Sequence, residues 1–117
     1  MRTLPNNAPT NVAAVDDRDP NAGNASHAYG IQFGGPSMVC KIQFQHEPRG
    51  VEGSKPGVFD DDLLAIIEDR LDGFQAGPFA CAENQVALDA VRAARSALGL
   101  RVARRIAAGV LGENKAH

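Results

Sequence analysis

Apolar and polar residues alternate with two different periods along the chain, and the period changes near residue 60. The segments AYGIQF (28–33) and VCKIQFQ (39–45) alternate residue by residue, which is typical of strands with one covered face. Gly34-Gly35-Pro36 between them indicates a turn. This region therefore predicts a β-hairpin, followed by a long glycine- and proline-rich loop over 46–58.

Beyond residue 60 the apolar residues follow a helical period. One helix face is predicted by steps of four, four and three between Leu63, Ile67, Leu71 and Phe74. The carboxylates of residues 60–62 are expected to cap this helix, and Gly77-Pro78 to end it. A second, longer helix is expected to begin near residue 79 or 80 and to end at Gly109 and Gly112.

These periods predict an α+β fold, with a short N-terminal β-hairpin followed by a helical hairpin. Residues 1–27 are rich in Asn, Ala, Pro, Gly and Asp and show no sustained apolar period. We expect them to form a flexible arm, and residues 28–117 to form a single strand-plus-helical-hairpin domain that binds a ligand.

Composition and motifs exclude several classes of function. The 117 residues carry a net charge of −2, which argues against a general nucleic-acid binder. No phosphate-binding loop, dinucleotide fingerprint, zinc-protease motif or nucleophile elbow occurs, so no enzyme, cofactor or metal is expected. No run of 18 apolar residues or secretory signal is present, which predicts a cytoplasmic protein without a membrane span.

Charge is divided between the two expected helices. Residues 60–72 hold six acids and one base, whereas residues 90–108 hold five arginines and no acid. The two helices, or two copies of the chain, are expected to attract each other. Arg101 and Arg105 lie four residues apart, so on a helix they share one face. This pair either binds phosphate oxygens or forms a solvated or ion-paired surface.

The residues around the break between the helices allow two interpretations each. Phe74 completes an apolar helix face or offers its ring to a base, and Asn84 caps locally or binds a base edge or ribose. A continuous helix would place Asn84 about 25 Å from Arg101. One ligand can contact both only if the helix breaks near Gly99 or two chains form the site.

The motifs FQAGPFACAEN (74–84) and RxxxR (101–105), with IQFQ (42–45) and LLAIIEDRL (63–71), resemble the phage Thoeris anti-defence family. That family shares its helical hairpin with the phage anti-CBASS cyclic-nucleotide sponges. The resemblance implies non-enzymatic sequestration of a cyclic ADP-ribose-type signalling nucleotide, glycocyclic ADP-ribose, by a homo-oligomer. The oligomer would be a dimer or a hexamer built as a trimer of dimers, joined through the helices.

Carried over by position, the resemblance assigns the ligand contacts to five residues. Phe74 would pack on the adenine, Asn84 would hydrogen-bond the base or ribose, and Arg101 and Arg105 would hold the diphosphate. Arg49 would close over the ligand from the long loop. The stretch AGVLGE (108–113) departs from the family's tail motif RGVEGT, which puts binding of cyclic oligonucleotides in doubt.

The alternative from a different class is a dimeric strand–helix–helix regulator that binds DNA. Its strand would enter the major groove, where alternating basic residues are expected. The segment VCKIQFQ supplies only Lys41. A plain interaction adaptor is a third interpretation, supported by the divided charge alone.

Overall fold

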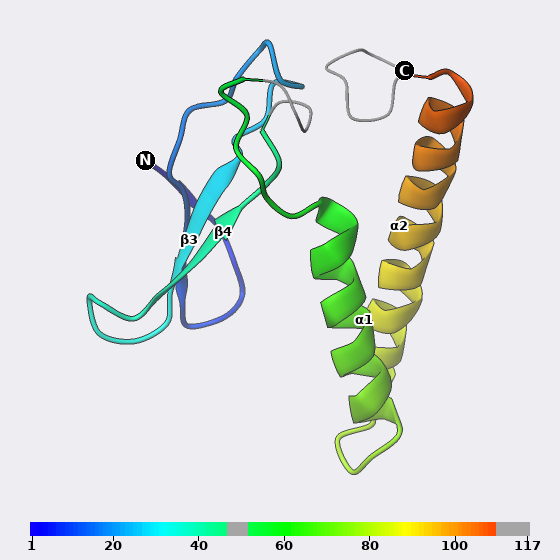
Figure 1. Cartoon of the computed structure of the whole chain (residues 1–117). Coiled ribbons are helices and arrows are strands. Elements are labelled where there is room, and N and C mark those ends of the chain that lie inside the picture. The colour runs from blue at the N-terminus through cyan, green and yellow to red at the C-terminus, as the bar shows by residue number, and fades with distance from the viewer. Residues whose placement is uncertain (47–51, 110–117) are drawn as a thin grey trace. The chain divides into compact units, whose positions relative to one another are not determined.

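The computed structural model describes residues 1–46 and 52–109, which divide into two units at Val58 and Phe59. The first unit contains four strands and the second contains two helices (Figure 1). The predicted α+β class is therefore confirmed. The division differs from the expected one, because the strands of residues 1–27 belong to the first unit and the helical hairpin forms a unit of its own.

The first unit is an antiparallel meander with the strand order β1-β2-β3-β4. Its strands are β1 (Arg2–Leu4), β2 (Asn11–Ala14), β3 (Ala28–Gln32) and β4 (Val39–Gln43). The predicted hairpin is β3–β4, in which Tyr29 lies opposite Ile42 and Ile31 lies opposite Cys40. Directly paired residues share one face of a sheet, so these side chains form one apolar face.

Residues 1–27, expected as a flexible arm, instead add two strands to this hairpin. Val12 lies opposite Ile31 and Ala14 opposite Tyr29, so β2 extends the same apolar face, and Ala14 is fully buried. The Asp16 carboxylate accepts hydrogen bonds from the backbone N–H groups of His27 and Ala28 at 3.0 and 3.1 Å. Burial raises the pKa of Asp16, but these hydrogen bonds outweigh it and leave the pKa below its usual value.

A second contact ties the N-terminal segment to the end of β4. The rings of His27 and His46 stack with their centroids 4.3 Å apart. His46 Nε2 also lies 3.1 Å from Asp19 Oδ2. Both contacts join residues far apart in sequence, which explains why a segment without its own periodicity is held against the sheet.

The second unit is a helical hairpin of α1 (Asp60–Gln75) and α2 (Ala82–Ala107), as predicted (Figure 1). Asp62 Oδ2 accepts the Phe59 N–H at 2.8 Å, which confirms a carboxylate cap on α1. α2 begins two to three residues later than expected, because Cys81 is extended and its sulfur caps the Asn84 N–H. Gly109, with φ of 71°, follows the last turn, as predicted.

α2 is much longer than its partner and is continuous through Gly99. At 1.5 Å per residue, its 26 residues extend about 39 Å, against about 24 Å for the 16 residues of α1. Arg95 is level with Asp61, at the start of α1, because their side chains are hydrogen-bonded. The C-terminal part of α2, from about residue 99 to Ala107, therefore continues beyond α1, and we call residues 99–107 the overhang.

Candidate functional site

Two aromatic rings and an arginine gather where the helices join, a region (residues 70–84) that we call the hairpin tip. The rings of Phe74 and Phe79 meet edge to face, with centroids 6.3 Å apart. The Arg70 guanidinium carbon lies 5.3 Å from the centroid of the Phe74 ring. Phe79 is 72% exposed and Phe74 is half-buried, so the tip presents aromatic surface to solvent.

Asn84 occupies the first turn of α2 beside these rings. Its side-chain amide donates to the carbonyl oxygen of Phe79 at 3.3 Å. It makes no other side-chain hydrogen bond with the described residues, so its Oδ1 acceptor is open. Phe74 and Asn84 thus lie on the same hairpin tip, each in contact with Phe79. Arg70 and Phe79 belong to the same cluster, although neither was predicted to have a role there.

The two candidate phosphate-binding arginines lie on the overhang, and their environments differ. Arg101 is exposed and forms no hydrogen bond or ion pair with any residue that the structure describes. Arg105 is only 6% exposed and is already engaged within the chain. The two guanidiniums, expected to share one helix face, therefore differ in accessibility in the single copy. Arg49, the fifth candidate, lies outside the described residues.

The hairpin tip and the overhang are opposite ends of one helix. Because α2 is continuous, Asn84 and Arg101 are separated by about 25 Å along its axis. A ligand the size of one nucleotide cannot contact both within one copy of the chain. Of the two arrangements that the sequence allowed, a helix broken near Gly99 is excluded.

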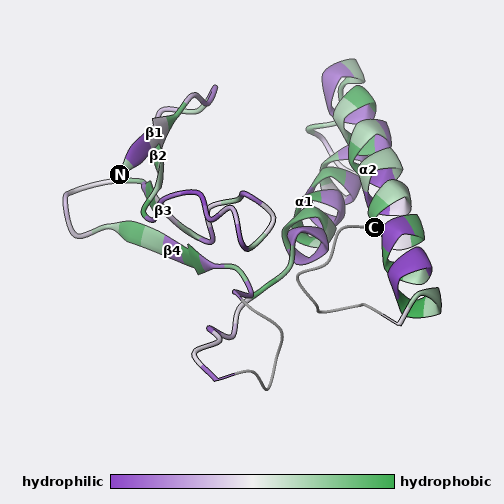
Figure 2. Cartoon of the chain, turned by 90° about the horizontal axis from the view of Figure 1, so that it is seen from above, coloured by the Kyte–Doolittle hydropathy of each residue, from purple (hydrophilic) through white to green (hydrophobic). Residues whose placement is uncertain are grey.

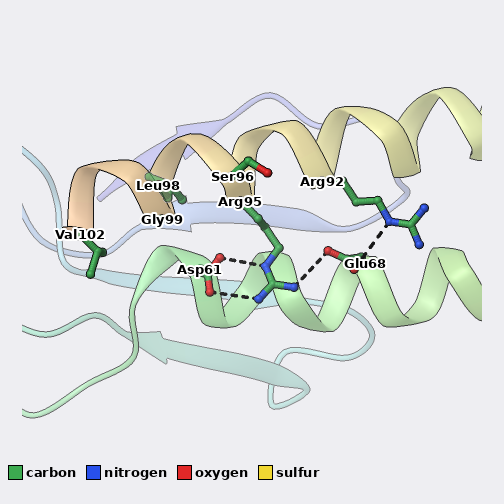
Figure 3. A pocket seen from close by; sticks show the side chains of 8 residues that line it. All are labelled: Asp61, Glu68, Arg92, Arg95, Ser96, Leu98, Gly99 and Val102. Carbon is green, nitrogen blue, oxygen red and sulfur yellow. Dashed lines mark hydrogen bonds and ion pairs between the residues drawn. The ribbon is translucent and has the colours of Figure 1, made fainter. Parts of the chain in front are cut away.

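A groove of about 670 Å³ lies between the helices, but its charges are neutralised internally (Figure 3). The Arg95 guanidinium donates to both oxygens of Asp61, at 2.9 and 3.2 Å, and to Glu68 at 3.0 Å. Arg92 pairs with Glu68 and Asp72. These contacts confirm the predicted attraction between the helices. The carboxylates that line the groove would repel a phosphate, so it is a poor anion site.

The Asp61–Arg95 pair changes the acidity of both groups. The hydrogen bond from Arg95 lowers the pKa of the Asp61 carboxyl, and burial opposes this only in part. The same hydrogen bond, with that to Glu68, raises the pKa of Arg95. Both groups are therefore held in their charged forms.

α2 carries two parallel stripes of residues on opposite sides. The inner stripe faces α1, and Leu88 within it is 2% exposed. Its members are Asn84, Leu88, Val91, Arg95 and Leu98. The outer stripe has the same spacing of four, three, four and three, and all its members are exposed: Val86, Ala90, Ala93, Ala97 and Leu100. Figure 2 shows apolar positions recurring along the length of both helices.

The outer stripe was not predicted, although its spacing is visible in the sequence. This spacing is that of the core positions of a coiled coil. A helix that is apolar on two sides is normally covered on both. The outer stripe is an apolar surface of this unit that α1 leaves exposed.

Other kinds of site find no support in residues 1–46 and 52–109. Within those ranges no group of three or more His, Cys, Asp and Glu side chains is placed to hold a metal ion. None of the helices formed there is long and apolar enough to cross a membrane. Asp60, Asp61 and Asp62 instead lie in the first turn of α1.

Comparison with known proteins matches the helical unit and part of the sheet to one family. The family model described as "Acb2/Tad1, hairpin domain" covers residues 37–103. The protein "Thoeris anti-defense 1" of Bacillus phage SBSphiJ7 is 32% identical over 93 residues, which are 80% of this chain. The chain spans 63% of the length of that relative.

Proposed function

Because the chain belongs to the Acb2/Tad1 hairpin-domain family, we propose that it is a phage anti-defence sponge. It binds a cyclic ADP-ribose-type signal, glycocyclic ADP-ribose, in the bacterial cytoplasm and keeps it from the effector of the Thoeris system. The signal is held and not degraded. A relative named for Thoeris anti-defence supports the anti-Thoeris role.

The observation that carries the proposal is the division of the site between the two ends of α2. The hairpin tip offers aromatic rings and the Asn84 amide, which suit an adenine base or a ribose. The overhang offers the exposed Arg101 guanidinium, which suits a diphosphate. A cyclic ADP-ribose contains both parts in one small molecule, so one ligand needs the tip of one copy and the overhang of another.

The outer stripe supplies a surface on which a second copy can dock. The stripe is nearly symmetric about Ala93, so antiparallel pairing sets Val86 of one copy against Leu100 of the other. Small side chains at Ala90, Ala93 and Ala97 allow two helices to approach closely. Antiparallel pairing also aligns the helix dipoles favourably.

Charge selects the antiparallel arrangement over the parallel one. The first two turns of α2 carry the acids Glu83 and Asp89, whereas residues 90–107 carry arginines and no acid. Antiparallel pairing brings the arginines of one copy toward the acids of the other, and parallel pairing would bring like charges together. It also brings Arg101 beside the hairpin tip of the other copy.

Within this composite site each residue has a defined role. Phe74 stacks on the adenine, and Asn84 hydrogen-bonds the base or ribose. Arg101 and Arg105 of the other copy hold the diphosphate, for which Arg105 exchanges its present interaction. Arg49 closes over the ligand. Three such dimers form a hexamer, and any cyclic oligonucleotide of CBASS defence binds at a separate surface.

Release of the ligand tests sequestration against degradation. The protein is incubated with glycocyclic ADP-ribose, denatured by heat, and the supernatant is analysed by chromatography and mass spectrometry. We expect the intact cyclic nucleotide to be recovered in stoichiometric amount. Recovery of a linear or cleaved product would show an enzyme and overturn the proposal.

Mixing of two variants tests whether the site is shared between copies. Asn84→Ala disables each hairpin tip and Arg101→Ala disables each overhang, so each variant alone is expected to bind about 100-fold more weakly. A mixed dimer keeps one site with an intact tip from one copy and an intact overhang from the other. Mixing after subunit exchange should therefore restore binding to part of the sites.

Arg92→Ala is the matched control, because Arg92 lies on α2 but pairs with acids of α1. It should bind like the wild type. Size-exclusion chromatography should show the same oligomer for all three variants. Failure of the mixture to recover any binding would mean that each site lies within one copy.

A further inference from the structure

Arg70 is the least explained cation of the helical hairpin. It lies on α1 one turn before Phe74, and its guanidinium carbon is 5.3 Å from the centroid of that ring. It is exposed and forms no hydrogen bond or ion pair with the described residues. Its interaction with the described residues is the cation–π contact with the ring of Phe74.

Arg70 differs from the two arginines that lie between the helices. Arg92 and Arg95 both form ion pairs with carboxylates of α1. Arg70 has no acid three or four residues away on its own helix, where its neighbours are Ile66, Ile67, Gly73 and Phe74. Nearby Asp72 pairs with Arg92 instead. Arg70 thus plays no part in holding the two helices together.

The contact with Phe74 occupies the surface that a base would need. A guanidinium at an exposed aromatic ring is held only weakly, so a planar base can displace it at little cost. A guanidinium is itself planar and stacks well on a flat ring system. Once displaced, Arg70 can cover the outer side of the base and direct its N–H groups to a phosphate of the same ligand.

We infer that Arg70 is a further ligand-binding residue of the hairpin tip. It covers the Phe74 ring in the empty protein and clamps the adenine of a cyclic ADP-ribose against that ring in the complex. The inference rests on the proposed function and adds a cation from the tip to those from the overhang. The ligand class it selects is a purine nucleotide, with a base to stack and a phosphate to pair.

Calorimetric titration of the full chain with glycocyclic ADP-ribose tests this role. Arg70→Ala should weaken binding about tenfold, and the loss should shrink in 0.5 M salt because part of it is ionic. Arg70→Lys keeps the charge but not the flat stacking surface, so it should recover only part of the affinity. Adenosine, which has no phosphate to pair with the retained charge, should discriminate less between Arg70→Ala and Arg70→Lys than the nucleotide does.

Three controls keep the outcome decisive. Circular-dichroism melting should be unchanged by Arg70→Ala, because the side chain is exposed and unpaired. Phe74→Ala should lose more affinity than Arg70→Ala, since it removes the ring on which the base stacks. If Phe74→Ala fails to bind while Arg70→Ala binds like the wild type, the role of Arg70 is refuted and the proposed function stands. If the wild type does not bind the nucleotide, both are refuted.

Discussion

The inner and outer stripes of α2 have the same spacing but opposite environments. Leu88, in the middle of the inner stripe, is 2% exposed, whereas Val86 and Leu100 of the outer stripe are 69% and 74% exposed. The inner stripe has α1 to cover it, whereas the described residues of the helical unit (59–109) form no third helix that could cover the outer one. Periodicity marks both faces as packing surfaces, and only one of them is packed.

The composition of the two stripes indicates what each one packs against. The inner stripe includes Arg95, whose charge is matched by the carboxylates of Asp61 and Glu68 on α1. The outer stripe is uncharged and lined with alanine between Val86 and Leu100. Burying a valine or leucine is worth about 1.5–3 kcal/mol, which the single copy leaves unused. This supports our proposal that a second copy covers the outer stripe.

The largest effect is expected when a charge is placed in the middle of the outer stripe. Ala93→Lys would place two ammonium groups against each other on the two-fold axis, without a partner. We expect complete dissociation of the oligomer and loss of nucleotide binding, while the helical content stays unchanged. Light scattering and circular dichroism measure these two properties.

Ala103→Lys is the matched control for this variant. It adds the same charge to an exposed position on α2 that belongs to neither stripe. It should leave the oligomer intact. Dissociation by both variants, or by neither, would contradict the assignment of the outer stripe as the interface.

A pair of leucine truncations sharpens the difference between the stripes. Leu88→Ala removes a fully buried side chain and should lower the free energy of unfolding by about 3 kcal/mol. Leu100→Ala removes an exposed side chain and should change the unfolding of the single copy by less than about 0.5 kcal/mol. Its effect should appear instead as weaker association. Urea unfolding at low and high protein concentration separates the two.

The elements predicted best were those with strong local signals. The hairpin β3–β4 follows from alternation around Gly34-Gly35-Pro36, and α1 follows from its apolar steps and the acids before them. β1 and β2 were missed because they are only three and four residues long. They are held by partners distant in sequence, such as Asp16 with His27 and Ala28, which no local window contains.

The candidate site was predictable in its chemistry but not in its completeness. Phe74 and Asn84 both contact Phe79 at the hairpin tip, and the long separation of Asn84 from Arg101 follows from helix geometry alone. The burial of Arg105, which is only 6% exposed, has no local signal in the sequence. The outer stripe was not predicted because one apolar face is enough to predict an amphipathic helix. A second apolar face stands out only when the structure shows that the first is already covered by α1.

The smallest expected effect concerns the charged member of the inner stripe and its dependence on pH. Arg95 holds the pKa of Asp61 below that of an unfolded chain, about 3.9. A carboxyl with a lowered folded-state pKa stabilises the fold above the unfolded value, and this stabilisation is lost as the pH falls through the folded value. Stability should therefore decline from about pH 5 downward, only modestly because both side chains are partly exposed.

Arg95→Gln should flatten this decline, since it returns the pKa of Asp61 toward its usual value. Arg101→Gln removes the same charge from an arginine that has no carboxylate partner among the described residues, and should keep the decline. Urea unfolding between pH 3 and 6, in the Ala93→Lys background, excludes any contribution from association. Equal pH profiles for the two glutamine variants would mean that apolar contacts alone hold the inner stripe against α1. The two stripes would then differ only in that α1 covers the inner one and leaves the outer one exposed.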